Sequence, residues 1–177
     1  MAKNSGKVFE NALKDSINKE RCLLIRLNDQ PQSFTKSAKF SLKQPCDFLL
    51  FDSKTKLFVP LELKTTAYKS MSFEDINGNN PNSAMIHKHQ ILGLLEFSRY
   101  DGCKAGFLLN FRTEPENVQR TYYISAQNFV DMCKKINKKS FNELDLLSVG
   151  KAIKVEGIKK RTRYMWNISG LLDKLSN

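Results

Sequence analysis

One predicted hairpin carries charged side chains where a buried strand is normally apolar, and it constrains the fold more than any other feature. Residues 59–65 are expected to form a strand, in which successive side chains point to opposite faces. Glu62 and Lys64 then share one face, roughly 6.5–7 Å apart along the strand, and an apolar stripe occupies the other face. A turn-like polar stretch joins this strand to a second predicted strand at 46–51. The hairpin therefore brings Asp47 beside Glu62.

Two carboxylates and a lysine at one point have a chemical meaning. Asp47 and Glu62 supply oxygen ligands of the kind that Mg²⁺ prefers, and a bound metal lowers the pKa of a water and neutralises charge at phosphorus. Lys64 is then placed to orient or deprotonate the attacking water, or to stabilise the phosphorane charge. The alternative is an exposed Glu–Lys pair on an edge strand, which contributes little to stability. An Asp followed after 14 residues by Glu-x-Lys resembles the core motif of the PD-(D/E)xK nucleases.

Length and charge narrow the class of protein further. The chain has 177 residues, so 1–177 is expected to form a single nuclease domain with a substantial core. Lys and Arg number 29 against 18 Asp and Glu, which gives a net charge of +11. Such an excess favours a polyanionic partner, and a basic but inert surface is the alternative.

Cysteine usage and the apolar runs exclude other classes. The four cysteines lie far apart in apolar runs without a CxxC, so buried thiols are expected and not disulfides or a zinc site. No apolar signal segment follows the first residues, and no run approaches about 18 apolar residues. We expect a soluble cytoplasmic protein that makes no membrane contact.

Two predicted helices bring further polar side chains toward the hairpin. A helix at about 6–19, capped by Ser5, places Glu10 at the margin of its apolar stripe. A helix at about 83–99 places His87 and Gln90, at i and i+3, on one face as phosphate or water contacts. The other predicted elements are a turn at 72–75, strands at 21–27, 103–111, 120–124 and 164–168, and helices at 125–135, from a capping box at 140–143, and at 171–175.

Basic residues gather in two segments. Residues 28–44 are expected to form a basic loop or short stalk, and 150–177 a basic C-terminal segment. Cations beside aromatic residues suit contact with a phosphate backbone. The alternatives are that the two phenylalanines of 28–44 anchor that loop to the body, and that 159–163 is a solvated loop. The predicted DNA contacts are Lys7, Lys36, Lys39, Lys43, Lys69, His87, Lys88, Lys159, Lys160, Arg161 and Arg163.

The order of these features resembles the RecU-type Holliday junction resolvases of Gram-positive bacteria and their phages, a branch of the PD-(D/E)xK fold. The resemblance covers roughly residues 5–135, and its matching motifs are Gly6-Lys-Val-Phe-Glu10, Asp47-Phe48, Glu62-Leu-Lys64, His87-Lys-His-Gln90 and the run 102–111. The chain departs from the family where Cys46 precedes Asp47 in place of Pro, Ser or Thr, and where 28–44 is short for the projecting stalk.

The resemblance implies an α/β fold with a restriction-endonuclease-like core, which is a mixed central β-sheet flanked by helices. It also implies a homodimer that makes paired cuts in four-way DNA junctions. The expected metal is Mg²⁺, for which Mn²⁺ can substitute. The expected location is the cytoplasm of a bacterial cell, which includes a phage-infected one. In this interpretation Asp47, Glu62 and Glu10 form the metal site, Lys64 assists the nucleophile and Gln90 positions a phosphate or water.

Two other functions stay open at this stage. One is a repair or restriction endonuclease with the same core that acts on duplex DNA. The other is a DNA-binding module that does not cut, and the intact set of Asp47, Glu62 and Lys64 speaks against it.

Overall fold

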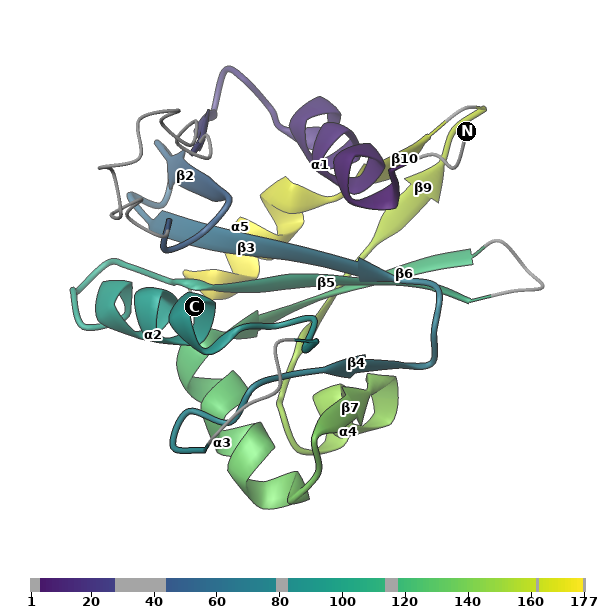
Figure 1. The fold of residues 1–177 in the computed structure, drawn as a ribbon. Helices are drawn as coiled ribbons and strands as arrows, with labels where there is room; N and C mark the ends of the chain where they lie inside the picture. Colours follow the sequence, from purple (N-terminus) through teal and green to yellow (C-terminus); the bar gives the residue numbers. More distant parts are fainter. Residues whose placement is uncertain (1–3, 28–43, 79–82, 114–117, 162, 177) are drawn as a thin grey trace, which may run out of the picture.

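A six-stranded mixed sheet runs through the middle of the molecule in the order β1-β2-β3-β5-β6-β8, and helices cover both of its faces (Figure 1). The computed structural model describes residues 4–27, 44–78, 83–113, 118–161 and 163–176. Strands β3 and β5 pair in parallel, and the other neighbours pair antiparallel. The predicted α/β fold, a mixed central β-sheet flanked by helices, is confirmed. The strands are β1 (Cys22–Arg26), β2 (Phe48–Asp52), β3 (Phe58–Thr66), β5 (Gly106–Thr113), β6 (Val118–Ser125) and β8 (Ile153–Val155).

Each face of the sheet has its own layer and its own hydrophobic core. The upper layer in Figure 1 contains α1 (Ser5–Ser16), α5 (Ile168–Leu175) and the hairpin of β9 (Gly157–Lys159) and β10 (Tyr164–Trp166). The lower layer contains α2 (Lys88–Phe97), α3 (Ala126–Ile136), α4 (Glu143–Ser148) and the paired strands β4 (Ser70–Ser72) and β7 (Ser140–Asn142).

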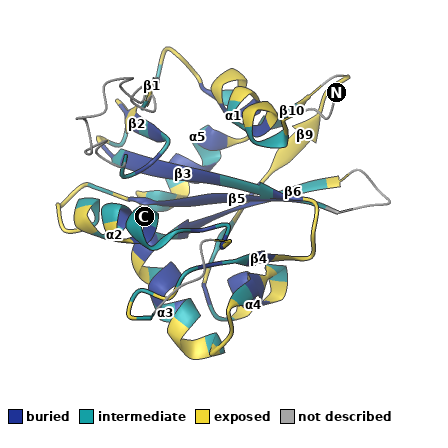
Figure 2. Ribbon diagram, viewed as in Figure 1, coloured by how far each residue is buried: buried dark blue, intermediate teal, exposed yellow. Residues whose placement is uncertain are grey.

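The central strands are buried on both faces, which explains their nearly continuous apolar sequence (Figure 2). On β3, Leu61 and Leu63 join the upper core, and on β5, Phe107 and Leu109 join the lower core. Burying a side chain of this kind stabilises a fold by about 1.5–3 kcal/mol. Glu62 is also on β3 and is only 3% exposed, so a carboxylate occupies a position that the core would otherwise fill.

Two helix starts differ from the sequence prediction. Asn4, and not Ser5, caps α1, because its Oδ1 accepts a hydrogen bond from the backbone N–H of Lys7 (3.3 Å). The capping box of α4 is formed by Asn142 and Asp145, two residues beyond the predicted pair. The predicted capping segment is instead β7, since Ser140–Asn142 pairs with β4 and cannot turn into a helix there. The prediction that Ser125 caps the following helix is confirmed.

The segment before α2 is extended where a helix was predicted. Ile86 forms a β-bridge with Phe73, so the helix begins at Lys88 and not at 83. The predicted turn at 72–75 is also wrong in part, because Ser70–Ser72 forms β4. The predicted basic loop at 28–44 lies almost wholly outside the described residues. The four cysteines are free, and Cys22 and Cys46 are buried. Across the described ranges, no helix is both long enough and apolar enough to cross a membrane.

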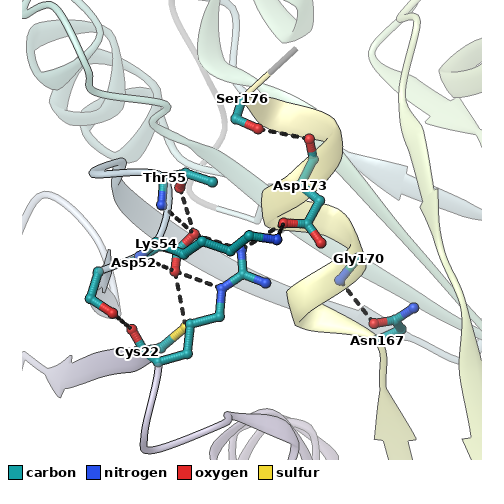
Figure 3. A network of polar contacts seen from close by, with 10 residues as sticks. Cys22, Asp52, Lys54, Thr55, Asn167, Gly170, Asp173 and Ser176 are labelled. Carbon is teal, nitrogen blue, oxygen red and sulfur yellow. Dashed lines mark hydrogen bonds and ion pairs between the residues drawn. The ribbon is translucent and has the colours of Figure 1, made fainter.

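An ion-pair network ties α5 to the β1–β2 hairpin (Figure 3). The Arg21 guanidinium donates to both oxygens of the fully buried Asp52 at 2.7 Å and to Asp173 of α5 at 2.9 Å. Lys54 also contacts Asp173, at 3.1 Å. The Arg21 hydrogen bonds hold the pKa of Asp52 well below its usual range. Because Asp52 ends β2, the network fixes the far end of the hairpin whose other end carries Asp47.

Candidate active site

Asp47 lies directly before β2, where β2 stops pairing with β3. Its backbone N–H donates to the carbonyl of Leu61 (3.1 Å), and its Oδ2 accepts from the backbone N–H of Leu63 (2.8 Å). The Asp47 carboxylate therefore accepts the Leu63 N–H in place of a backbone carbonyl of the neighbouring strand. Beyond Leu61, β3 continues to Thr66 and, among the described strands, pairs only with β5, so the side of β3 that faced β2 is open there. Asp47 and Glu62 lie together at this open edge of β3.

Glu62 is held by two donors from different elements. The Lys64 ammonium, two residues along the same strand, lies 3.0 Å from Glu62 Oε1. Gln90 of α2 donates from Nε2 to the same oxygen. The structure therefore brings together Asp47, Glu62, Lys64 and Gln90, as the sequence spacing indicated.

The amide of Gln90 is oriented by a chain of contacts behind it. Its Oε1 accepts from the backbone N–H of His87 (2.9 Å), which leaves Nε2 to face Glu62. His87 Nδ1 lies 3.0 Å from Glu74 Oε1, and Glu74 Oε2 accepts from the backbone N–H of Lys88 (2.6 Å). These bonds also lower the pKa of Glu74. Sequence reasoning missed Glu74, because it stands in a polar stretch without periodicity.

A glycine lets α2 approach the site closely enough for this contact. A Cβ placed on Gly93 would lie 2.8 Å from the Cα of Pro45, two residues before Asp47. Glycine in the middle of a helix costs about 1 kcal/mol relative to alanine, so its presence here needs a packing reason. The close approach of Pro45 is that reason, and it lets α2 place Gln90 beside Glu62.

Glu10 lies near the site but is paired with an arginine. Its Oε2 is 2.9 Å from Arg26 Nε at the end of β1, and its charge contributes to raising the pKa of Asp47. Among the residues that the structure describes, no three His, Cys, Asp or Glu side chains gather closely enough to hold a metal ion by themselves. The structure thus brings Asp47 and Glu62 together, and places Glu10 on Arg26.

Both carboxyl groups of the pair ionise less readily than usual. Burial raises the pKa of Glu62 to about 7, and the charge of Asp47 adds to the shift. Burial also raises the pKa of Asp47, against the opposing effects of the Leu63 N–H and Lys64. Two buried acids that repel one another favour a cation between them.

The donor set fits a magnesium ion. Mg²⁺ is usually held by one or two carboxylates and completes its shell with waters and substrate phosphates. Asp47 and Glu62 supply the two carboxylates; Glu62 is buried and Asp47 is half-buried. A third protein carboxylate is therefore not needed for this kind of site.

The predicted DNA contacts fall into three groups. Lys36, Lys39 and Lys43 lie outside the described residues. His87 and Lys88, at the start of α2, belong to the chain of contacts behind Gln90 and are partly exposed. The remaining residues are exposed, and they are Lys7 on α1, Lys69 in the turn after β3, and Lys159, Lys160, Arg161 and Arg163 on the β9–β10 hairpin.

Comparisons with known proteins give one relative that spans nearly the whole chain. No protein-family model matches the sequence. The chain is 31% identical over 184 residues to the SPbeta prophage-derived uncharacterized protein YotM of Bacillus subtilis (strain 168), an alignment that covers 98% of this chain and 88% of YotM. The chain belongs to the YotM family. The alignment with YotM spans the segment of the Asp47–Glu62 site and also the basic C-terminal hairpin.

Among solved structures, this YotM-family fold is similar to Hjc of Archaeoglobus fulgidus, a Holliday junction resolvase from an archaeal hyperthermophile. The two chains are 13% identical, with a TM-score of 0.49, and the similarity covers 84% of this chain and 93% of Hjc.

Proposed function

We propose that this protein is a metal-dependent endonuclease that resolves four-way DNA junctions by paired, symmetric nicks. The observation that carries the proposal is the convergence of Asp47, Glu62 and Lys64 at the edge of β3, with Gln90 fixed against Glu62. A carboxylate pair with an adjacent ammonium suits the hydrolysis of a phosphodiester. The net charge of +11 suits a DNA substrate.

Each residue of the site has a distinct role in this proposal. Asp47 and Glu62 would hold Mg²⁺ or Mn²⁺, which when bound supplies a water of lowered pKa and offsets charge at the phosphorus. Lys64 is placed to hydrogen-bond the attacking water or a phosphate oxygen. Gln90 holds the Glu62 carboxylate in one orientation, and His87 and Glu74 in turn hold Gln90.

We further propose a two-fold homodimer of RecU-like type, phage-derived like its relative YotM and working in the bacterial cytoplasm. A four-way junction is nearly two-fold symmetric, and paired cuts need two matched sites at a fixed distance. A two-fold homodimer supplies one Asp47–Glu62–Lys64 site for each strand that is cut.

The test is an end-labelled four-way junction incubated with the protein and Mg²⁺, with a linear duplex of the same sequence as the control. We expect cuts in two opposing strands of the junction, ligatable products and slow cutting of the duplex. Equal cutting of both substrates would reassign the protein to the duplex endonucleases. Binding without any cutting, with Mg²⁺ or Mn²⁺, would overturn the nuclease proposal.

A further inference from the structure

A basic pocket lies on the opposite face of the sheet from Glu62, in the upper layer of the molecule. Here α1, the end of β5 and the β9–β10 hairpin line an open pocket of about 280 Å³. Five cationic side chains line it and no acidic side chain does, the cations being Arg112, Lys159, Lys160, Arg161 and Arg163. Such a lining favours an anion with several negative charges.

The cations of this basic pocket differ in whether an acidic side chain pairs with them. Arg163 pairs with Asp15 at 2.6 Å, so that part of its charge is already offset. Lys159, Lys160 and Arg161 are exposed and have no ion-pair partner within the described part of the chain. Three uncompensated cations on one short hairpin repel one another, and a bound polyanion would relieve that repulsion.

Two further features of the pocket suit phosphate. Ser5, in the first turn of the 12-residue helix α1, lines it, and the helix dipole favours negative charge at such an end. Arg112 is held in place, because its Nε donates to Thr65 Oγ1 (2.8 Å), which itself donates to the buried Asn110 (2.8 Å). The pocket therefore combines an anchored guanidinium with a helix terminus and exposed lysines.

The anchor also places the pocket relative to the candidate active site. Thr65 follows Glu62 by three residues on β3, and successive side chains of a strand point to opposite faces of the sheet. The pocket and the Asp47–Glu62 site therefore lie near the same end of β3 but on opposite faces of the sheet.

We propose that this basic pocket binds the phosphate backbone of the DNA substrate at a point away from the scissile phosphate, on the opposite face of the sheet. The inference rests on the proposed function, in that the DNA held here is the substrate cut at Asp47 and Glu62. It adds a role for Arg112 and for the C-terminal hairpin that the catalytic residues do not require, since the pocket would bind DNA without a metal ion.

The single tryptophan of the chain gives a direct readout. Trp166 is 3% exposed and its ring stacks on Tyr164, with centroids 5.2 Å apart, and meets Phe9 edge-on at 6.2 Å. Both Tyr164 and Phe9 line the pocket. An occupant of the pocket should therefore change the fluorescence of Trp166.

The experiment is a titration of the metal-free full chain with a DNA duplex, followed by Trp166 fluorescence. The pocket variant Lys159→Glu/Arg161→Glu is compared with the control variant Lys135→Glu/Lys139→Glu, which changes the net charge equally on exposed residues of the lower layer. We expect the wild type and the control to give a saturable signal. The pocket variant should bind at least about tenfold more weakly, and its salt dependence should fall by about two phosphate contacts.

Several outcomes would overturn the inference. Equal weakening by the two variants would show that only overall charge matters. A DNA complex that leaves Trp166 fluorescence unchanged would show that the DNA does not occupy the pocket. Saturation by inorganic phosphate alone, with no response to DNA, would assign the pocket to a small anion. A separate variant, Arg112→Gln, should weaken binding without a charge reversal, and a thermal melt of each variant confirms that it is folded.

The same samples distinguish this inference from the nuclease proposal. Adding Mg²⁺ to the wild-type complex measures cleavage independently of the fluorescence signal. A pocket-dependent signal without cleavage would leave the pocket standing and overturn the nuclease. If the wild type cleaves the DNA and the pocket variant binds and cleaves it equally well, the nuclease proposal stands and the pocket inference is overturned.

Discussion

At the scale of the residue, Glu62 has the chemistry that depends most on its surroundings. It is buried beside Asp47, and this raises its pKa to about 7, while Lys64 and Gln90 oppose the shift. In the unfolded chain a glutamate has a pKa of about 4.3. Between these two values the folded protein binds more protons than the unfolded chain, so rising pH destabilises the metal-free protein over this window.

Replacement of Glu62 by glutamine should remove this pH dependence. In a chelator, the wild type should lose on the order of 3 kcal/mol of stability between pH 4.5 and 8 through this group, because a shift of one pKa unit corresponds to about 1.36 kcal/mol. Glu62→Gln keeps a neutral amide at the same place, so it should match the wild type at low pH and exceed it at pH 8. Urea midpoints at the two pH values measure the difference. A difference between the two proteins that does not change with pH would contradict the assignment.

At the scale of the element, α2 serves the site through its close contact with the residues before Asp47. Gly93→Ala would normally stabilise a helix by about 1 kcal/mol. Here the new methyl would meet the Pro45 backbone at 2.8 Å. We expect instead a loss of about 1–3 kcal/mol, as is typical of overpacking, together with slower cleavage as Gln90 moves from Glu62.

The control for this prediction is on the same helix. Leu92 is 43% exposed, and Leu92→Ala should leave the cleavage rate close to that of the wild type. Denaturation and single-turnover cleavage of both variants are the measurements. A Gly93→Ala protein that is stabilised and fully active would show that the approach of α2 does not position Gln90.

Elements with strong local signals could be predicted from the sequence, and elements defined by distant partners could not. Strand β3 and helix α3 have clear apolar periods and caps, and both lie close to their predicted ranges. Strands β4, β7, β8 and β9 have three residues each, too few for a period, and each pairs with a partner elsewhere in the chain.

The site shows the same division. The hairpin spacing was enough to bring Asp47 beside Glu62, and helical spacing was enough to turn Gln90 toward them. The pairing of Glu10 with Arg26 depends on how α1 lies over the end of β1, which no local pattern encodes. Glu74 and Arg112 reach their places through tertiary packing, and so they had no signal in the sequence.

At the scale of the whole molecule, the outer end of the sheet has an apolar face suited to a second copy. Leu23 and Ile25 of the edge strand β1 are 58% and 47% exposed. They pair across the strands with Phe51, which is 38% exposed, and Leu49, so their side chains lie on one face. We expect the proposed two-fold dimer to bury this face, because exposed apolar patches mark association surfaces.

Sedimentation velocity at micromolar concentration tests the dimer. The wild type should sediment as a dimer, and Ile25→Glu should shift it to the monomer. Leu144→Glu, at a 70% exposed position on α4, is the matched control and should remain dimeric. A monomeric wild type, or a dimer unaffected by Ile25→Glu, would place the association elsewhere or exclude it.

The most direct test of the central claim, that Asp47 and Glu62 form a metal-dependent nuclease site, is the single-turnover cleavage of a labelled four-way junction by the wild type, Asp47→Asn and Glu62→Gln. Each variant should lower the Mg²⁺-dependent rate by at least about 100-fold, since even partners behind the metal ligands are worth 10–100-fold. Junction binding in chelator should stay close to the wild-type value, because these acids hold the metal and do not grip phosphate. Near wild-type cleavage by either variant would contradict the account.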